Sequence, residues 1–345
     1  MSSPAVEANS PSSTPGIVAV SETSPSLALI KYWGKRAGGI NLPATGSLAA
    51  TLDALTTTTR VRTAANDELL IDGSVQEPDR AAPFFAEARR ILGAGTHFHA
   101  ESVNSFPQAA GLASSSSGYA ALALACSRLV ASVAPEPAVR LRAASLSLRE
   151  LSALARVGSA SASRALLGGF VLLPAGGRFA RSLAPAEHWP ELRVLVSVVS
   201  REAKELSSRA AMARTQATSP YYRAWVGAAG AELADAVAAI QSRDLERLGR
   251  AMRRSYLRMF ATMLGCDPPL LYWTPSSVAL IRECERLRSE GLGAWETMDA
   301  GPQVKVLCLA SELARIRERL ASLGVELIES RIGGPPATRV EEGAR

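Results

Sequence analysis

A segment of small residues that runs directly into a long apolar stretch most constrains this chain. Residues 104–118 read NSFPQAAGLASSSSG, and YAALALACSRLVASVA follows without a break. Short side chains let backbone N–H groups approach an anion, and the following residues have helical composition, so the helix macrodipole would favour negative charge at this point. The spacing does not fit the Walker P-loop. The segment predicts a phosphate-binding loop, although a Ser-rich N-cap on an ordinary core helix explains the same residues equally well.

Composition limits the class of protein. The 345 residues, 47% hydrophobic and 20% charged, can bury a substantial core and are enough for two domains. The net charge is +6, but the sequence contains no dense run of Lys and Arg with interleaved aromatic residues. Acidic small molecules are therefore expected partners, and nucleic acid is not. No uncharged apolar run reaches the ~18–20 residues of a membrane span, and the first residues lack the order of a signal peptide. No membrane partner is expected.

Cysteine usage points to a reducing compartment. The spacing of the four cysteines contains no CxxC and favours neither a zinc site nor a disulfide framework. They are Cys126, Cys266, Cys284 and Cys308. A cytoplasmic location is the corresponding expectation.

The pattern along the chain changes from strand-rich to helix-rich. A mobile tail is expected over 1–22, then an N-terminal domain over 23–190, a C-terminal domain over 191–335 and a tail over 336–345. The first domain should contain strands between 27 and 70, a helix near 79–92, a strand at 98–104 and one helix over 140–155. Long helical stretches follow a strand at 192–200. A hairpin is expected over 293–309, then a helix around 312–324 and a strand at 325–330.

Four other segments carry reactive side chains, and each also has an ordinary structural explanation. Residues 31–36, KYWGKR, fit a solvated strand end with a packed tryptophan. Residues 158–169, GSASASRALLGG, fit close backbone packing, because Gly and Ala let chains approach. Residues 200–212, SREAKELSSRAAM, fit an amphipathic helix with its charges in water. Residues 298–302, MDAGP, fit a turn in which the aspartate caps its own backbone.

Together, and in chain order, these segments resemble the motifs of the diphosphomevalonate decarboxylases within the GHMP kinase superfamily. The resemblance covers the NxFPxAAGLASS loop, the IKYWGKR signature, the GSGSAxRSxxGG loop, the KxxSSxxxM segment and the MDAGP string, across residues 26–309. It implies a two-domain α+β GHMP kinase fold, with an N-terminal domain like ribosomal protein S5 domain 2 and a ferredoxin-like C-terminal domain. The active site would lie in the cleft between them.

The resemblance also implies roles for individual residues. Tyr32 and Lys35 would bind the terminal phosphates of the substrate. ATP phosphates would be bound by the loop residues Gly111, Leu112, Ala113, Ser114, Ser115 and Ser116. ATP would bring Mg2+, for which the sequence indicates no protein ligand.

The remaining motifs supply the substrate carboxylate site and the reacting groups. Ser159, Ser161 and Arg164 would hold the carboxylate and phosphate, since the planar guanidinium can bind a carboxylate through two hydrogen bonds. The helical segment would bring Lys204 to the nucleotide phosphates, Ser208 to the γ-phosphate, and Arg209 and Met212 to the substrate. Asp299 would be the catalytic base, and Arg164 and Lys204 would assist.

The implied activity is ATP-dependent decarboxylation of mevalonate 5-diphosphate to isopentenyl diphosphate in the mevalonate pathway, by a homodimer. Three alternatives stay open: decarboxylation of mevalonate 5-phosphate, phosphorylation alone by a mevalonate 3-kinase, and a non-catalytic anion-binding paralogue. Four departures from the family motifs put substrate identity in question. They are Ser26 and Thr45, where relatives carry asparagine, and Leu257 and Phe260 in an altered stretch over 255–260.

Overall fold

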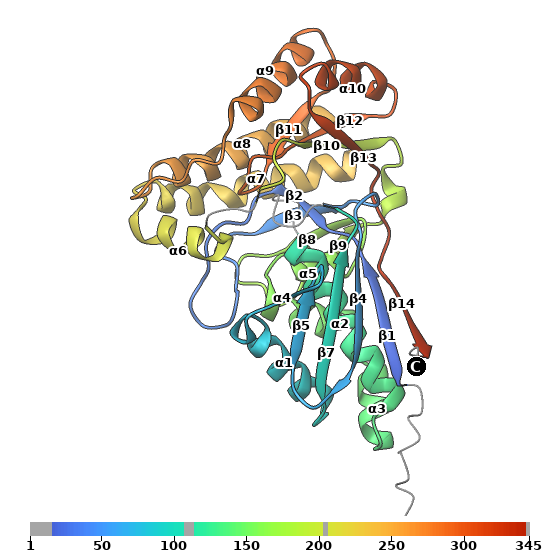
Figure 1. Cartoon of the computed structure of the whole chain (residues 1–345). Helices are drawn as coiled ribbons and strands as arrows, with labels where there is room; N and C mark the ends of the chain where they lie inside the picture. Colours follow the sequence, from blue (N-terminus) through green and yellow to red (C-terminus); the bar gives the residue numbers. More distant parts are fainter. Residues whose placement is uncertain (1–15, 107–113, 203–205, 343–345) are drawn as a thin grey trace, which may run out of the picture.

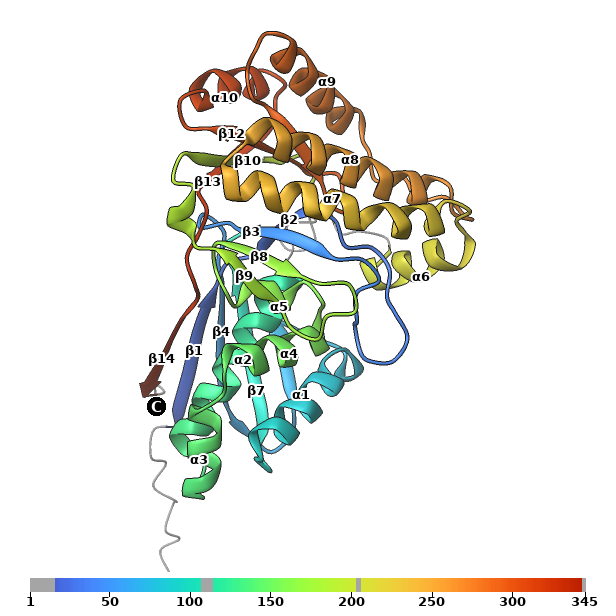
Figure 2. The ribbon, with the colours of Figure 1, turned by 180° about the vertical axis from the view of Figure 1, so that it is seen from behind.

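The computed structural model describes residues 16–106, 114–202 and 206–342. The chain forms two α+β domains, one above the other in Figure 1, and Figure 2 shows the same arrangement from behind. The lower domain contains most of the N-terminal strands, and the upper domain contains the long C-terminal helices.

A six-stranded sheet forms the body of the lower domain. Its order is β14 (Ala337–Glu342), β1 (Ile17–Thr23), β4 (Thr57–Ala64), β7 (His97–Asn104), β5 (Glu68–Ile71) and β6 (Ser74–Val75). All pairs are antiparallel except β5 and β7. Helices α1 (Pro78–Leu92) and α2 (Ser114–Val133) lie behind this sheet in Figure 1 and in front of it in Figure 2. The alternating burial along β4 and β7 follows from this one-sided cover.

Helix α2 is the central element of the lower core. Among the described residues it alone is long and apolar enough to cross a membrane by length and composition, and 67% of its most apolar window is buried inside the protein. Its core partners are mostly aromatic and aliphatic side chains, including Phe84, Phe85, Phe98 and Leu154. The predicted helix behind the phosphate loop is therefore a core helix.

Two segments predicted as tails are strands. Residues 17–22 belong to β1 and residues 337–342 form β14, and these strands pair in antiparallel register from Ile17 opposite Glu342 to Glu22 opposite Ala337. The tail predictions over 1–22 and 336–345 are wrong for these residues. Both segments are short and partly exposed, and a strand of this kind is stabilised by a distant partner that local composition does not reveal.

A second sheet lies between the two domains (Figures 1 and 2). Its order is β2 (Ser26–Ile30), β3 (Ser47–Thr51), β8 (Phe170–Leu173) and β9 (Arg181–Ala184). Every residue of β2 and β3 is buried. One hydrophobic cluster joins Leu29 and Leu48 of this sheet to Leu248 and Met252 of the upper domain. The second sheet therefore fixes the position of one domain against the other.

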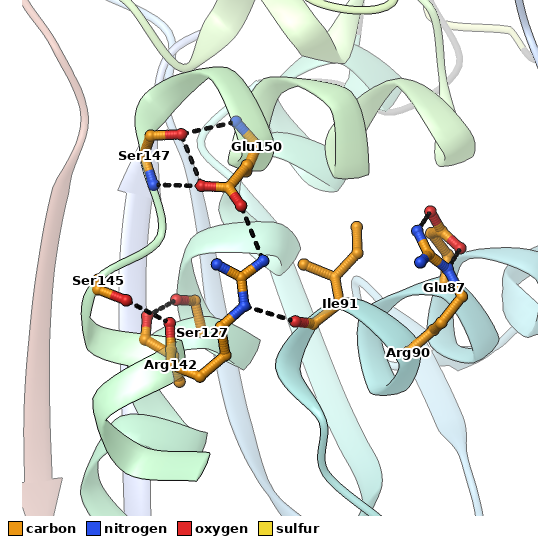
Figure 3. Close-up of polar contacts among 9 residues, drawn as sticks. Glu87, Arg90, Ile91, Ser127, Arg142, Ser145, Ser147 and Glu150 are labelled. Atoms are coloured by element: carbon orange, nitrogen blue, oxygen red, sulfur yellow. Dashed lines mark hydrogen bonds and ion pairs between the residues drawn. The ribbon is translucent and has the colours of Figure 1, made fainter. Parts of the chain in front are cut away.

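The helix expected over 140–155 is two helices, α3 (Pro137–Ala144) and α4 (Leu148–Gly158). Ser147 starts α4 with a capping box: its side chain accepts from the Glu150 backbone N–H, and its own backbone N–H donates to Glu150 Oε2 at 3.0 Å. Figure 3 shows these bonds, with Arg142 donating to Glu150 at 2.7 Å and to the Ile91 carbonyl at 3.2 Å. The single-helix prediction is wrong because Ser147 acts as an N-cap, which ends the helical run at α3 and starts a new helix at Leu148.

The upper domain is built on a four-stranded antiparallel sheet of order β11 (Trp295–Met298), β12 (Val304–Leu309), β10 (Leu192–Val198) and β13 (Glu326–Ser330). With helices between β10 and β11 and between β12 and β13, this is the split βαβ arrangement of a ferredoxin-like fold. The helices are α6 (Ser208–Thr218), α7 (Tyr222–Ser242), α8 (Leu245–Leu264), α9 (Pro275–Ser289) and α10 (Leu313–Ala321). The predicted hairpin over 293–309 is confirmed as β11, a turn and β12.

The chain also contains two short helical elements, α5 and η1. The one-turn helix α5 (Ala162–Ala165) lies within the predicted Gly/Ser/Ala stretch over 158–169, and the 3-10 turn η1 (Ala186–His188) precedes β10. The domain boundary near 185–195 stays a prediction. Strand β14 returns to the first sheet after the upper domain is complete.

Candidate active site

One cleft collects most of the predicted site residues. Its volume is about 700 Å³, within the range of small-molecule sites. The predicted residues that line it are Tyr32, Lys35, Ser114, Ser115, Ser159, Ser161, Arg164, Ser208, Arg209, Met212 and Asp299. They come from both domains. The predicted residues Gly111, Leu112, Ala113 and Lys204 lie outside the described residues.

Asp299 lies in the turn between β11 and β12, where two ammonium groups hold its carboxylate. Lys31 Nζ donates to Oδ1 at 2.8 Å, and Lys305 Nζ donates to Oδ2 at 3.1 Å. The lysine side chains are only 2% and 3% exposed, whereas Asp299 keeps 25%. The carboxylate is oriented by buried cations and still lines the cleft.

The charges around Asp299 keep its carboxylate ionised. Burial by itself would raise the pKa of Asp299. The positive charges and hydrogen bonds of Lys31 and Lys305 outweigh burial and hold that pKa well below its ordinary value. Burial lowers the pKa of Lys31 to about 8, although Asp299 acts in the opposite direction. Asp299 therefore offers an ionised acceptor throughout the physiological pH range.

The sequence motifs assign a chemical role to Asp299 but to neither of its lysine partners. A signal for Lys305 exists in the hairpin register. Lys305 lies opposite Thr297, so its side chain is on the same face as residue 299, two positions beyond Thr297. Lys31 has no such local signal, because it is separated from Asp299 by 268 positions in the sequence.

Arg164 on α5 is buried in the wall of the cleft, with 2% exposure. Its Nη1 donates to Ser47 Oγ at 2.5 Å, and its Nε has no hydrogen-bond partner within the described part of the chain. Burial lowers the pKa of Arg164 to about 10, against the opposing effects of Asp299 and Tyr32. A buried guanidinium with an unused N–H is suited to bind an anionic group in the cleft.

Strand β2 ends at Ile30, and the residues after it turn along the cleft. Tyr32 Oη is buried without a partner among the described residues, and burial raises the pKa of Tyr32, so the phenol stays a neutral donor. Burial lowers the pKa of Lys35 to about 8, and the nearby Arg209 adds to this effect. Gly34 has φ +95°, and a Cβ there would lie 1.8 Å from Tyr222 Oη, so glycine is required between the two ligand-facing residues.

The N-terminus of α2 borders the main cleft and a smaller recess. Ser114 and Ser115 line both, and the recess has a volume of about 160 Å³. Its apolar walls include Leu69, Ile71 and Leu122. A helix N-terminus next to an apolar recess suits a ligand with a ring at one end and phosphates at the other.

Ser116 lies behind the surface of the cleft and not in it. It is fully buried, its Oγ is 3.0 Å from Ser26 Oγ, and it donates to the Ser161 carbonyl at 3.1 Å. Ser116 therefore connects α2 to β2 and to the 159–161 loop. The hydroxyl of Ser116 is already bonded inside the protein, so the backbone N–H is the group left for a nucleotide phosphate, and the cofactor role of Ser116 stays a prediction.

The altered stretch over 255–260 is mostly core. Phe260 is 1% exposed and packs at 5.2 Å from the Trp273 ring, and Leu257 packs on the same cluster. Only Met259 of this stretch lines the cleft. Ser26 also lines the cleft, whereas Thr45 is buried and donates to the Lys31 carbonyl at 3.4 Å. Leu257 and Phe260 therefore fill space and do not alter the cleft surface.

A divalent cation such as magnesium prefers oxygen donors. The described residues contain no group of three or more His, Cys, Asp or Glu side chains that could hold a metal ion. Both carboxylate oxygens of Asp299 are bound by ammonium groups. The hydroxyls of Ser114 and Ser115 are hard oxygen donors at the helix N-terminus. This set fits magnesium, which retains waters and binds largely through ligand phosphates.

Comparison with known protein families gives two matches along the chain. Residues 23–184 match the diphosphomevalonate decarboxylase-like N-terminal domain. Residues 194–330 match the mevalonate 5-diphosphate decarboxylase C-terminal domain. The chain belongs to the diphosphomevalonate decarboxylase family.

Individual members of the diphosphomevalonate decarboxylase family are similar to this protein over most of the chain. A diphosphomevalonate decarboxylase of Ganoderma lucidum is 35% identical over 326 residues, covering 85% of this chain and 78% of its own length. The mevalonate diphosphate decarboxylase of Enterococcus faecalis is 34% identical, with a TM-score of 0.81 over 94% of this chain and 99% of its own. A structure of MDDEF in complex with MVAPP, AMPPCP and magnesium has a TM-score of 0.82, 34% identity and the same coverage. The two-domain α+β fold expected of the family is confirmed.

Proposed function

We propose that this protein is a lyase that decarboxylates mevalonate 5-diphosphate at the expense of ATP, giving isopentenyl diphosphate, ADP, phosphate and CO2. The observation that carries the proposal is that Asp299, Arg164 and the N-terminus of α2 line the same cleft. Similar proteins are diphosphomevalonate decarboxylases, and one similar structure is that of MDDEF in complex with MVAPP, AMPPCP and magnesium. This supports ATP and Mg2+ for this chain as well.

Substrate binding follows from the charges of the cleft. The diphosphate lies at Tyr32 and Lys35, which present a neutral donor and a cation. The carboxylate that leaves as CO2 lies at Arg164, whose Nε is unused. Ser159 and Ser161, whose hydroxyls are 3.0 Å apart, lie in the same cleft, and Arg209 and Met212 complete its wall from α6.

Asp299 acts at the 3-hydroxyl group. It accepts the hydroxyl proton as that oxygen bonds to the γ-phosphorus and ADP departs. Phosphoryl transfer through a loose transition state needs positioning more than a strong base, which fits a carboxylate of low pKa held by two lysines. The C3–O bond then breaks and releases phosphate. The electron pair of the C1–C2 bond forms the alkene as CO2 leaves.

The remaining groups stabilise charge on the nucleotide. The backbone N–H groups and hydroxyls at the start of α2 face the phosphates. Ser114 and Ser115 are the residues that would hold magnesium, which when bound would supply positive charge to the phosphates. Lys204 is assigned to the same phosphates by resemblance, and this stays a prediction.

A single assay distinguishes the decarboxylase from a kinase of the same fold. With mevalonate 5-diphosphate, ATP and Mg2+, we expect one CO2 and one alkene to be formed for each ADP released. ADP without CO2 would instead identify a 3-kinase, and faster turnover of mevalonate 5-phosphate would reassign the substrate. A non-catalytic paralogue has lost its main support, because Leu257 and Phe260 are core residues.

Substrate affinity should depend on pH through Lys35. Its pKa, about 8 in the free protein, lies below that of an exposed lysine, and a bound diphosphate favours the charged form. Affinity is therefore complete below pH 8 and is lost as the pH rises above it. Calorimetric titration with mevalonate 5-diphosphate between pH 6.5 and 9.5 would measure this. In Lys35→Arg, which stays charged, the loss above pH 8 should disappear. An identical loss in both proteins would assign the titration to Lys31 or to the ligand.

We also propose a cytoplasmic location for this enzyme. All four cysteines are free and buried, which suits a reducing compartment. The homodimer implied by the family resemblance stays a prediction.

A further inference from the structure

Asn41 contacts two parts of the cleft that the sequence motifs treat as separate. It lies in the loop after the KYWGKR segment, lines the cleft and is 7% exposed. Its Oδ1 accepts a hydrogen bond from Lys35 Nζ at 2.6 Å. Its Nδ2 donates to the Val157 carbonyl at 2.8 Å and approaches the carbonyls of Arg156 and Gly158 at 3.3 Å each. One side chain is therefore bonded to the Lys35 ammonium and to the last turn of α4.

The contact with α4 supplies hydrogen-bond donors to the C-terminal end of that helix. The last carbonyls of a helix have no partner within it, and Asn41 supplies an amide donor to three of them. The chain continues directly from α4 to Ser159 and Ser161. Arg156 strengthens the same junction, because its guanidinium donates to the Ile40 carbonyl and, at 2.8 Å, to the Arg178 carbonyl.

The backbone of Asn41 also suits its residue type. Its φ is 52°, in the left-handed region where asparagine is tolerated and most other side chains are strained. The loop is further closed by the Arg36 N–H donating to the Leu42 carbonyl at 2.9 Å and the Ala44 N–H donating to the Gly34 carbonyl at 3.0 Å. The position of the Asn41 amide is thus set before any ligand binds.

We propose that Asn41 is a positioning residue for the substrate diphosphate, which places the Lys35 ammonium at a fixed distance from the Ser159 and Ser161 hydroxyls. The proposal rests on the proposed function, which assigns these residues to the phosphorylated substrate. A lysine head group on a flexible stem is a poorly directed cation unless another group holds it. The Lys35 ammonium has three N–H donors. One of them is bound by Asn41 Oδ1, and two remain for phosphate oxygens. Because the amide is neutral, it orients the ammonium without cancelling its charge.

The first test is the affinity of Asn41→Gly for mevalonate 5-diphosphate and for inorganic pyrophosphate, measured by calorimetry without ATP. Glycine keeps the left-handed backbone and removes both side-chain contacts. We expect both dissociation constants to rise roughly 10-fold, the size of one hydrogen bond to a charged group, while kcat at saturating substrate changes less than about 2-fold. Arg243→Gly is the matched control, because Arg243 has φ 55° at the end of α7, away from the cleft. Wild-type affinity in Asn41→Gly would overturn the proposal.

A double-mutant cycle tests whether Asn41 acts through Lys35. In a Lys35→Met background, adding Asn41→Gly should weaken pyrophosphate binding no further, because the group it positions is gone. An equal loss in both backgrounds, or full affinity in Lys35→Met itself, would contradict the proposal. The proposed function fails in a different way, namely by absence of CO2 release from the wild-type protein, and the affinity comparison does not depend on that release.

A second substitution covers the case in which Asn41→Gly does not fold. Asn41→Asp keeps a left-handed-tolerant residue and an acceptor for Lys35. Its negative charge would neutralise the ammonium and repel the phosphates, so pyrophosphate affinity should fall at least as much as in Asn41→Gly. Unchanged affinity in a folded Asn41→Asp protein would show that the charge at this position is irrelevant to the diphosphate.

Discussion

Asp299→Asn is expected to lower turnover by ~10²–10⁴-fold, the contribution typical of a positioned acid–base group, while nucleotide and substrate still bind. Asparagine keeps the shape of the side chain and cannot accept the 3-hydroxyl proton. The measurement is single-turnover release of ADP and CO2, with both affinities measured on the same protein. Near-wild-type turnover in a folded variant would contradict the mechanism, and Asp299 would then be only a turn residue.

The two lysines make stability a necessary control for this variant. Asp299→Asn removes the carboxylate that balances the buried Lys31 ammonium, and breaking a buried ion pair on one side is destabilising. The expected result is a lower melting temperature. In Asp299→Asn with Lys31→Met, the ammonium group that has lost its carboxylate is removed as well. That double variant should recover part of the stability but none of the turnover, which separates the chemical role of the carboxylate from its structural role.

Arg164→Lys is expected to reduce kcat/KM by roughly 10²-fold or more, although the charge is kept, because two hydrogen bonds to an anion are lost. A lysine ammonium has three N–H donors but lacks the planar fork of the guanidinium, so it cannot reproduce the bond from Arg164 Nη1 to Ser47 together with a bidentate contact to the substrate carboxylate. Steady-state kinetics with varied mevalonate 5-diphosphate would measure the change.

The matched control for Arg164→Lys is Arg288→Lys. Arg288 is also a mostly buried arginine, paired with Glu296 at 2.5 Å, and does not line the cleft. We expect Arg288→Lys to lower the melting temperature with little effect on kcat/KM. Equal kinetic losses in the two variants would mean that Arg164 acts on the fold and not on the substrate.

Much of the fold and of the site was accessible from sequence because the relevant signals are local. The hairpin over 293–309, the strand at 98–104 and the helix after the Ser-rich loop follow from periodicity and turn residues within short windows. The cleft residues were found from motifs, each of which occupies one segment. The structure then showed that these segments share one cavity.

The features that the sequence did not predict are contacts between distant segments or choices between local alternatives. Strand β1 lies between β4 and β14, and β14 comes from the far end of the sequence. Lys31 becomes a partner of Asp299 only when the two domains meet. The hydroxyl of Ser116 bonds Ser26 and Ser161 inside the protein, which the phosphate-loop motif does not reveal. The split of α3 from α4 came from a local competition, in which the capping box at Ser147 prevails over helical composition.

The pairing of β1 with β14 has a consequence for how the chain reaches its native state during synthesis. Glu22 of β1 binds Arg339 of β14, and 317 positions of sequence separate them. Until β14 has been made, the outer edge of β1 carries unpaired N–H and C=O groups, so the first domain to emerge from the ribosome is the last to be completed. The nascent N-terminal domain therefore has an open sheet edge throughout translation of the C-terminal domain. A fragment cut between the two domains would keep that edge permanently, as a site for self-association.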